Sequence, residues 1–449
     1  MRVILTIITL LFLSACSVTF PKMNTALVSS APKPIPANDR SEELTVILTF
    51  SGGGTRAAAL SYGVLKELRD TNITINNKKR RLLDEVDLIS SVSGGSFTSA
   101  YYGLFGDRIF QDFERKCLKK RVQSDLIKLS LLSPKAWVRL LPGFFERSDL
   151  AAEYYNQFIF KKKHFRDLRK DAPYIVINAT DLSLGQGFAF TDYHFRWICS
   201  NLDDYPISRA VAASSAVPVL FSPITLENHS SKCNYSPIIW SSKNISEQEK
   251  KRYEQSLEIK KYRDDKRYKY LHLVDGGVAD NLGIRSLVDM TTYHGNSMWN
   301  AFNSYKMQKT KKLVFIVVNA SGFPNLKTAK SRITPSTLAV LDTTTSIQSN
   351  KYNVETIDLL RSKFPIWKKQ IAKGRCVKKR TADCAQIEME LIEVNLQDLT
   401  QKEKSELSHV PTSLELPVKT VDNLTKAGSN LLKRDENYQK LLKSLRFIH

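Results

Sequence analysis

The sequence predicts an α/β protein in which helices cover both faces of a mostly parallel central sheet. The main observation is that short apolar runs alternate with longer helix-like stretches, a pattern typical of such sheets. A second observation is that the runs at 44–50 and 86–92 lead directly into glycine-rich turns and then into helix-like sequence. With 449 residues, 42% of them hydrophobic and 25% charged, the chain can bury a large core.

The expected elements follow one another in a regular order. Strands are expected at 44–50, 86–92, 174–179, 270–274, 313–319 and 387–394, and helices at 56–69, 96–105 and 208–216. Two segments interrupt this alternation. Residues 128–160 mix aromatic, leucine and basic side chains, so they form either an amphipathic helical pair on the core or a lid over an acyl-chain site. Residues 228–269 are polar and highly charged, and a surface insertion is expected there.

The N-terminus has the features of an exported lipoprotein. A basic start and a short apolar run are followed by the sequence Leu-Ser-Ala-Cys ending at Cys16, which resembles the lipobox of bacterial lipoproteins. We expect a signal peptide over 1–15, an acylated Cys16, a flexible tether over 16–43 and a folded domain over 44–449. A plain signal peptide with an incidental cysteine is the alternative. The apolar run is too short to span a bilayer, which takes about 20 residues.

The chain carries a formal net charge of +22, from 67 Lys and Arg against 45 Asp and Glu. Such an excess attracts polyanions, among them anionic lipid surfaces and nucleic acids. No nucleic-acid recognition motif is present, and an exported protein rarely meets nucleic acid, so we expect a membrane surface and no nucleic acid as partner. A solvated basic surface is the plainer interpretation. The expected location is the bacterial cell envelope, lipid-anchored at the periplasmic face or in the outer membrane.

Five cysteines remain besides Cys16. Export to an oxidising compartment permits disulfides, and Cys376 and Cys384 flank a short polar loop that a disulfide could close. The odd number leaves at least one free thiol. No Cys-x-x-Cys pair or histidine-rich spacing indicates a metal site, and no cofactor is expected.

A glycine-rich turn, Gly52-Gly53-Gly54, lies between the first expected strand and helix. Consecutive backbone N–H groups at such a turn converge on negative charge, as in an oxyanion hole. The turn fits neither of the two common glycine-rich nucleotide-binding patterns. Arg56 follows it and either steadies the loop or contacts a substrate phosphate.

A serine-rich turn, Ser91-Val92-Ser93-Gly94-Gly95, ends the second expected strand. A nucleophile elbow places a serine on a sharp strand-to-helix turn with small residues on either side, usually in the pattern Gly-x-Ser-x-Gly. Here the first glycine is replaced by Ser91, which is also small. The pattern makes Ser93 the candidate nucleophile.

An aspartate followed by two glycines, Asp275-Gly276-Gly277, ends the strand expected at 270–274. Asp275 is positioned to act as the base for a serine, although an ordinary tight turn with a solvated aspartate would have the same sequence.

The three stretches, in this order, resemble the patatin-like phospholipase family. The segments 178–181 and 212–221 strengthen the resemblance, which covers about 44–319. Ser91 and Ala57 depart from the family, which usually has glycine at both positions, but neither change removes a reactive group.

The resemblance implies the three-layer fold of that family and a Ser–Asp dyad without histidine. Ser93 would attack an ester of a membrane phospholipid or lysophospholipid, and Asp275 would accept its proton. The N–H groups of Gly52, Gly53 and Gly54 would form the oxyanion hole.

Two alternatives remain open from the sequence. One is a Ser-His-Asp triad, for which the chain order allows His294, His409 or His449. His272 is instead expected to be a strand residue that supports the turn at Asp275. The other is a non-catalytic lipid-binding or scaffold lipoprotein of the same fold.

Overall fold

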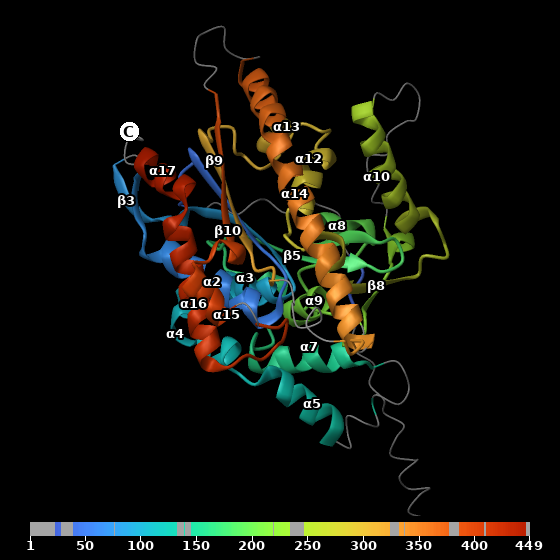
Figure 1. Ribbon diagram of the computed structural model, residues 1–449. Helices are drawn as coiled ribbons and strands as arrows, with labels where there is room; N and C mark the ends of the chain where they lie inside the picture. The colour runs from blue at the N-terminus through green and yellow to red at the C-terminus, as the bar shows by residue number, and fades with distance from the viewer. Residues whose placement is uncertain are drawn as a thin grey trace, which may run out of the picture.

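The computed structural model describes residues 23–27, 39–75, 77–132, 139, 145–218, 220–233, 247–323, 332–335, 337–376, 386–407 and 410–445. These residues form three layers, with an eight-stranded sheet between two sets of helices (Figure 1). The predicted fold class is therefore confirmed. Within these ranges, no helix combines the length and the apolar character that a membrane crossing requires.

Five parallel strands form the main part of the sheet. In spatial order they are β10 (Glu388–Asn395), β9 (Lys312–Asn319), β1 (Leu44–Phe50), β4 (Val86–Val92) and β5 (Tyr174–Asp181). All five were expected from the sequence, within two residues at each end. β1 and β9 read as almost continuous apolar runs because helices cover both faces of the sheet, whereas β10 at its edge alternates glutamate with apolar residues.

Three more strands extend the sheet beyond β5 through antiparallel pairs. They are β6 (Gln186–Phe190), β7 (Ile224–Glu227) and β8 (Tyr270–Asp275). β6 and β8 each pair with β5, and β7 pairs with β8. A strand has only two edges, and β6 pairs along 177–181 of β5, so β4 and β8 share the other edge. β4 pairs as far as Asn178 and β8 pairs from Ala179 onward. The two strands therefore meet end to end, each with its C-terminal end at the junction.

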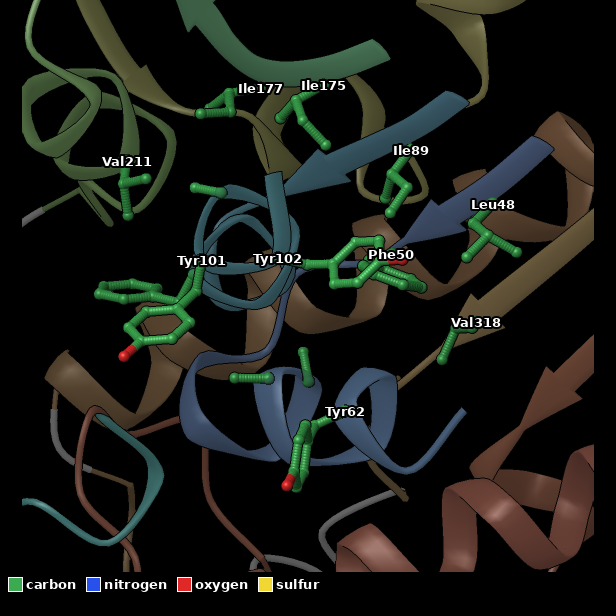
Figure 2. Packing of buried hydrophobic residues seen from close by; sticks show 14 of the residues in the cluster. Leu48, Phe50, Tyr62, Ile89, Tyr101, Tyr102, Ile175, Ile177, Val211 and Val318 are labelled. Atoms are coloured by element: carbon green, nitrogen blue, oxygen red, sulfur yellow. The ribbon is translucent and has the colours of Figure 1, made fainter. Parts of the chain in front are cut away.

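One apolar core lies between the sheet and a set of helices near both ends of the chain. These helices are α2 (Gly54–Asp70), α3 (Gly94–Phe105), α16 (Val418–Arg434) and α17 (Glu436–Leu445). Figure 2 shows Leu48 and Phe50 of β1 in this core, with Tyr62 of α2 and Tyr102 of α3. Burial of aromatic rings on this scale accounts for a large part of the stability of such a core.

A second core covers the opposite face of the sheet. Its helices are α12 (Arg285–Tyr293), α13 (Met298–Ser304) and α14 (Thr337–Cys376), the long orange helix of Figure 1. Ile47 of β1 and Phe315 of β9 belong to this core, whereas their neighbours Leu48 and Ile316 belong to the first one. This alternation is the period of two expected of strands that are buried on both faces.

Further helices connect these elements. They are α4 (Ile109–Phe113), α5 (Val122–Leu132), α7 (Arg147–Phe158), α8 (Asp192–Trp197), α9 (Ile207–Ser214), α10 (Glu247–Asp264), α11 (Gly277–Asp280) and α15 (Gln401–Leu407). A small hairpin of β2 (Asn72–Ile75) and β3 (Lys78–Arg81) follows α2. The charged helix α10 lies in the expected polar insertion. The aromatic segment contains α5 and α7, and residues 133–138 and 140–144 between them lie outside the described residues.

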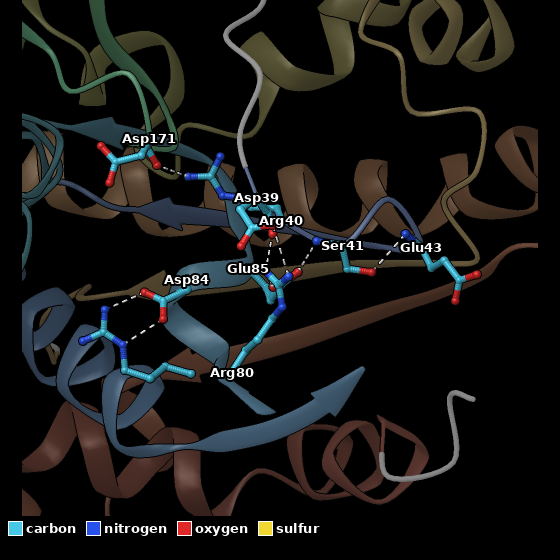
Figure 3. A network of polar contacts seen from close by, with 9 residues as sticks. Asp39, Arg40, Ser41, Glu43, Arg80, Asp84, Glu85 and Asp171 are labelled. Carbon is cyan, nitrogen blue, oxygen red and sulfur yellow. Dashed lines mark hydrogen bonds and ion pairs between the residues drawn. The ribbon is translucent and has the colours of Figure 1, made fainter. Parts of the chain in front are cut away.

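The start of the expected domain is fixed by polar contacts (Figure 3). Glu85 is fully buried, and its carboxylate accepts hydrogen bonds from the Ser41 N–H at 2.7 Å and from Arg80 at 3.1 Å. Arg40 donates to the backbone carbonyl of Asp171 at 2.6 Å. These contacts hold the chain in place just before β1 begins.

Residues 23–27 fall within the expected tether but lie against the domain. The Asn24 side chain is buried and exchanges hydrogen bonds with the backbone of Glu227 at 2.7 and 2.8 Å. The Leu27 N–H donates to the Cys199 carbonyl at 2.7 Å, and Ala26 forms a bridge with Ser200. This part of the segment is therefore docked next to β7.

A disulfide joins Cys199 to Cys233, a pair that the sequence did not single out. Cys376 is also disulfide-bonded, while Cys384, its suggested partner, lies outside the described residues. Cys117 is a buried free thiol.

Candidate active site

Ser93 lies at a sharp turn between β4 and α3. Its backbone angles are φ 49° and ψ −120°, a conformation that costs a non-glycine residue about 1–3 kcal/mol. The two glycines that follow allow the chain to pass close to its neighbours. A Cβ at Gly94 would lie 1.9 Å from the Gly54 carbonyl oxygen, and one at Gly95 would lie 2.7 Å from that of Phe50. This is the geometry expected of a nucleophile elbow.

The Ser93 hydroxyl donates a hydrogen bond to Oδ2 of Asp275 at 2.7 Å. Both side chains are buried, with 4% and 7% of their surface exposed. The other carboxylate oxygen of Asp275 accepts the Gly277 N–H at 2.8 Å. Burial raises the pKa of Asp275 to about 6, although the hydrogen bonds from Gly277 and Ser93 partly offset this rise. The carboxylate is therefore more basic than an exposed aspartate.

The direct contact follows from the end-to-end meeting of β4 and β8. β4 delivers Ser93 and β8 delivers Asp275 to the same edge of β5, from opposite directions. The approach is so close that a Cβ at Gly276 would lie 2.3 Å from the Asn178 carbonyl oxygen and 3.1 Å from a Val92 methyl group. Glycine after Asp275 is therefore a steric requirement.

Ser214, at the end of α9, connects the turn after β4 with the turn after β8. Its hydroxyl accepts the Ser93 N–H at 2.8 Å and donates to the Asn178 carbonyl at 2.6 Å. Its own carbonyl accepts the Gly276 N–H at 3.2 Å. The sequence pointed to the segment 212–221 only through the family resemblance and gave Ser214 no role, since nothing local indicates which of two adjacent serines turns inward.

The neighbouring serines have structural partners of their own. Ser90 donates to the Gly283 carbonyl at 2.6 Å, and Ser91 lies 2.6 Å from the hydroxyl of Ser99. Ser96 donates to the carbonyl of Ser93 at 2.5 Å. Of the serines in this turn, Ser93 alone contacts a carboxylate within the described part of the chain.

The glycine-rich turn lies directly beside Ser93, but its three N–H groups differ. The Gly52 N–H donates to the Asn281 carbonyl at 3.0 Å, so it is already used within the protein. Gly53 and Gly54 have φ angles of 134° and 58°, which favour glycine, and their N–H groups have no acceptor among the described residues. Two of the three predicted donors are therefore available to an oxyanion. Gly52 instead provides space, because a Cβ there would lie 3.3 Å from that of Ser93.

Arg56 is buried behind this turn. It donates to the carbonyls of Ala320 at 2.8 Å and Val410 at 2.6 Å, and to the Thr412 hydroxyl at 3.3 Å. These contacts connect the turn to the loops after β9 and before α16. They agree with the loop-support alternative for Arg56.

No histidine contacts Ser93 or Asp275 among the five that the structure describes. His294 bonds the Met290 carbonyl at 2.9 Å, and His272, on β8, bonds the Thr225 hydroxyl at 3.0 Å. His409 and His449 lie outside the described residues, as does Cys16. The described residues also contain no cluster of three or more groups that could hold a metal ion.

A comparison with family models identifies the class of protein to which this fold and site belong. The sequence matches the model of the patatin-like phospholipase family over residues 48–288, more than half of the chain. The chain therefore belongs to the patatin-like phospholipase family. The match extends from β1 into α12 and includes the glycine-rich turn, Ser93 and Asp275.

Several solved structures align with this chain at low sequence identity and with TM-scores below 0.5. Human GIVD cytosolic phospholipase A2 aligns at 12% identity with a TM-score of 0.44, covering 90% of this chain and 60% of that one. The same human protein in complex with methyl gamma-linolenyl fluorophosphonate gives a TM-score of 0.42 at 12% identity, covering 91% and 60%. VipD from Legionella pneumophila gives 0.32 at 11% identity, covering 93% and 72%. The chain thus spans about 60% of the human phospholipase. A search of curated proteins gave no match.

Proposed function

We propose that the protein is an acyl-ester hydrolase of membrane lipids, of the phospholipase A or lysophospholipase type, with Ser93 and Asp275 as its catalytic dyad. The observation that carries the proposal is the 2.7 Å hydrogen bond from the Ser93 hydroxyl to a buried carboxylate of raised pKa. A base must be unprotonated yet basic enough to accept a hydroxyl proton, and a pKa of about 6 meets both needs near neutral pH.

In the first half of the reaction, Ser93 Oγ attacks the ester carbonyl while Asp275 takes the hydroxyl proton. The tetrahedral intermediate places its negative oxygen at the N–H groups of Gly53 and Gly54. Asp275 then returns the proton to the departing alcohol, and the acyl group stays on Ser93. In the second half, water attacks the carbonyl of the acyl-enzyme while Asp275 accepts a proton from the water. The bond between the acyl group and Ser93 Oγ then breaks, Asp275 returns the proton to Oγ, and the fatty acid leaves.

The proposed location is the cell envelope, with Cys16 acylated and inserted in the membrane that holds the substrate. The lipobox-like sequence at Cys16 and the net charge of +22 support this assignment. Palmitate labelling of the full chain expressed in a bacterium tests it, since a Cys16→Ser variant should lose the label. Equal labelling of both proteins would contradict the acylation.

The catalytic proposal is tested with full-length protein on vesicles made from a mixed lipid extract, followed by mass spectrometry of the products. Wild type should release fatty acid, and Ser93→Ala and Asp275→Asn should each lower the rate by at least about 10³-fold. Ser405→Ala, which changes an exposed serine, should match wild type. Unchanged hydrolysis in either dyad variant would refute the dyad.

The alternative function, a lipid-binding or scaffold lipoprotein without turnover, makes a different prediction. A fluorophosphonate probe should label Ser93 if the dyad is active and should leave a non-catalytic protein unlabelled. Labelling of wild type but not of Ser93→Ala would exclude the alternative.

A further inference from the structure

A polar pocket of about 140 Å³ lies apart from the dyad, at the same C-terminal end of the parallel strands. It is bounded by residues at the C-terminal ends of β9 and β10 and by the middle of α14. In open α/β sheets, ligands bind at the carboxyl ends of the parallel strands, so its position is one where a ligand is expected. One ordered water needs only about 10–15 Å³ of such space, so the pocket has room for several waters or for a small polar group.

Side-chain amides are the most frequent group in the lining. Asn319, Asn350, Asn353, Asn395 and Gln397 supply five of them. Asn319 Oδ1, Asn395 Oδ1 and both polar atoms of the Asn353 amide already have partners within the protein, whereas the side chains of Asn350 and Gln397 have none among the described residues. A free amide carries both a hydrogen-bond donor and an acceptor, and a hydroxyl group offers the same combination in return. The lining therefore matches a ligand with several hydroxyl groups.

The charges of the lining argue against other ligands. Arg361 pairs with Glu393 and, at 3.4 Å, with Asp358, so these three side chains together carry one net negative charge. This net negative charge would repel an anionic group such as a terminal phosphate. The same net charge would attract an ammonium group, but the Arg361 guanidinium lies in the same lining, and none of the described lining residues is aromatic and able to bind it by a cation–π contact. Neutral hydroxyl groups fit best.

The pocket is connected to the dyad through Asn353. Its Nδ2 donates to the Ser321 hydroxyl at 2.8 Å, and its Oδ1 accepts from Asn281 Nδ2 at 3.4 Å. Asn281 in turn holds the Gly52 N–H, next to Ser93. The nucleophile follows β4, and β1 and β9 separate β4 from β10. At about 4.8 Å per strand, the pocket between β9 and β10 lies about 12 Å from Ser93. The backbone and head group of a glycerophospholipid can span this distance.

We propose that this pocket is a head-group subsite for lipids whose head group ends in several hydroxyls, such as glycerol. The proposal rests on the acyl-ester hydrolase function proposed above and names its substrate class. The acyl ester lies at Ser93 while the polyol is held by the amides of α14 and the loop after β10.

The test uses Asn350→Leu, because Asn350 lines the pocket, lies on a helix and has no hydrogen bond to lose among the described residues. Vesicles contain equal amounts of phosphatidylglycerol, phosphatidylethanolamine and phosphatidic acid, so all three substrates share one surface charge. Wild type should hydrolyse phosphatidylglycerol faster than the other two lipids. In Asn350→Leu the ratio of these rates should fall about tenfold, which is the effect of one or two hydrogen bonds. Gln348→Leu, on the exposed side of the same helix, should behave as wild type.

A binding measurement separates this inference from the catalytic one. Ser93→Ala protein should bind glycerophosphoglycerol in calorimetry, and Ser93→Ala with Asn350→Leu should not. Binding without any lipid hydrolysis by wild type would leave the subsite standing and refute the hydrolase. Equal use of the three lipids by wild type, an equal loss on all three in Asn350→Leu, or binding unaffected by Asn350→Leu would each overturn the subsite.

Discussion

The Ser214 hydroxyl accepts the backbone N–H of Ser93 at 2.8 Å, across 121 residues of sequence. Ser93 is in a strained conformation, and this bond is one of the contacts that hold it there. Because the same hydroxyl donates to Asn178, Ser214 fixes the elbow relative to β5. Ser214, which does not contact Asp275, thus positions the proposed nucleophile.

Replacement of Ser214 by alanine should therefore lower both stability and turnover. It leaves the buried N–H of Ser93 without an acceptor, which costs about 1–3 kcal/mol. We expect a lower midpoint in urea unfolding and a lower kcat with little change in KM. Ser215→Ala, at the next position and bonded within its own helix to Val211, is the matched control. Equal kcat in the two variants would show that Ser214 does not position Ser93.

The carboxyl group of Asp275 should contribute more to the stability of the fold in acid than at neutral pH. Its pKa is about 6 in the folded protein against an ordinary 3.8, so folding favours the protonated form. The corresponding stability is fully present below about pH 4 and is lost as the pH rises through 6, an effect of about 3 kcal/mol. Asp275→Asn should thus be inactive yet more stable than wild type at pH 8. Unfolding curves at pH 4 and 8 measure this, with Asp398→Asn, an exposed site, as control. A gain that is the same at both pH values would contradict the assignment.

The same pKa sets the pH dependence of catalysis. As a base, Asp275 works only when deprotonated, so kcat/KM for a soluble ester should rise through an apparent pKa near 6 and level off above it. The rise should be tenfold per pH unit well below 6. A profile that stays flat from pH 4 to 8 would exclude Asp275 as the base.

Gly94 should tolerate no side chain. A Cβ there would lie 1.9 Å from the Gly54 carbonyl oxygen, so Gly94→Ala must push the elbow and the oxyanion turn apart. A displacement of about 1 Å at a reacting group can cost 10²-fold in rate, and we expect at least that loss of kcat/KM. At Gly187, an added Cβ meets nothing within 4 Å, so Gly187→Ala should retain full activity.

The disulfide between Cys199 and Cys233 should stabilise the fold. It closes a loop with a sequence separation of 34, for which loop-closure entropy predicts about 3–4 kcal/mol. A Cys199→Ser, Cys233→Ser double variant should show this loss in urea unfolding. The variant is preferable to a reducing agent, because reduction would also open the bond at Cys376. An unchanged unfolding midpoint would contradict the prediction.

Sequence reasoning predicted the parallel half of the sheet well, because strands such as 44–50 and 86–92 are largely buried and are rich in Val, Leu and Ile. It missed β6 and β7, which are short and partly polar, and it could not foresee that β8 runs antiparallel to β5. At the site, Ser93, Asp275 and the glycine turn could be proposed because each carries a local pattern.

Contacts between distant segments left no such pattern. Ser214, the use of the Gly52 N–H by Asn281, the Cys199–Cys233 pair and the docking of Asn24 beside β7 all depend on tertiary pairing. A linear sequence does not show which residues become neighbours in this way.

The end-to-end meeting of β4 and β8 also restricts the length of the chain. One residue inserted into β8 before Asp275 would advance the carboxylate along the strand axis by about 3.3 Å and turn it to the opposite face of the sheet. Deletions would withdraw it by the same step. Insertions and deletions in β8 should therefore be as damaging as loss of the carboxylate itself.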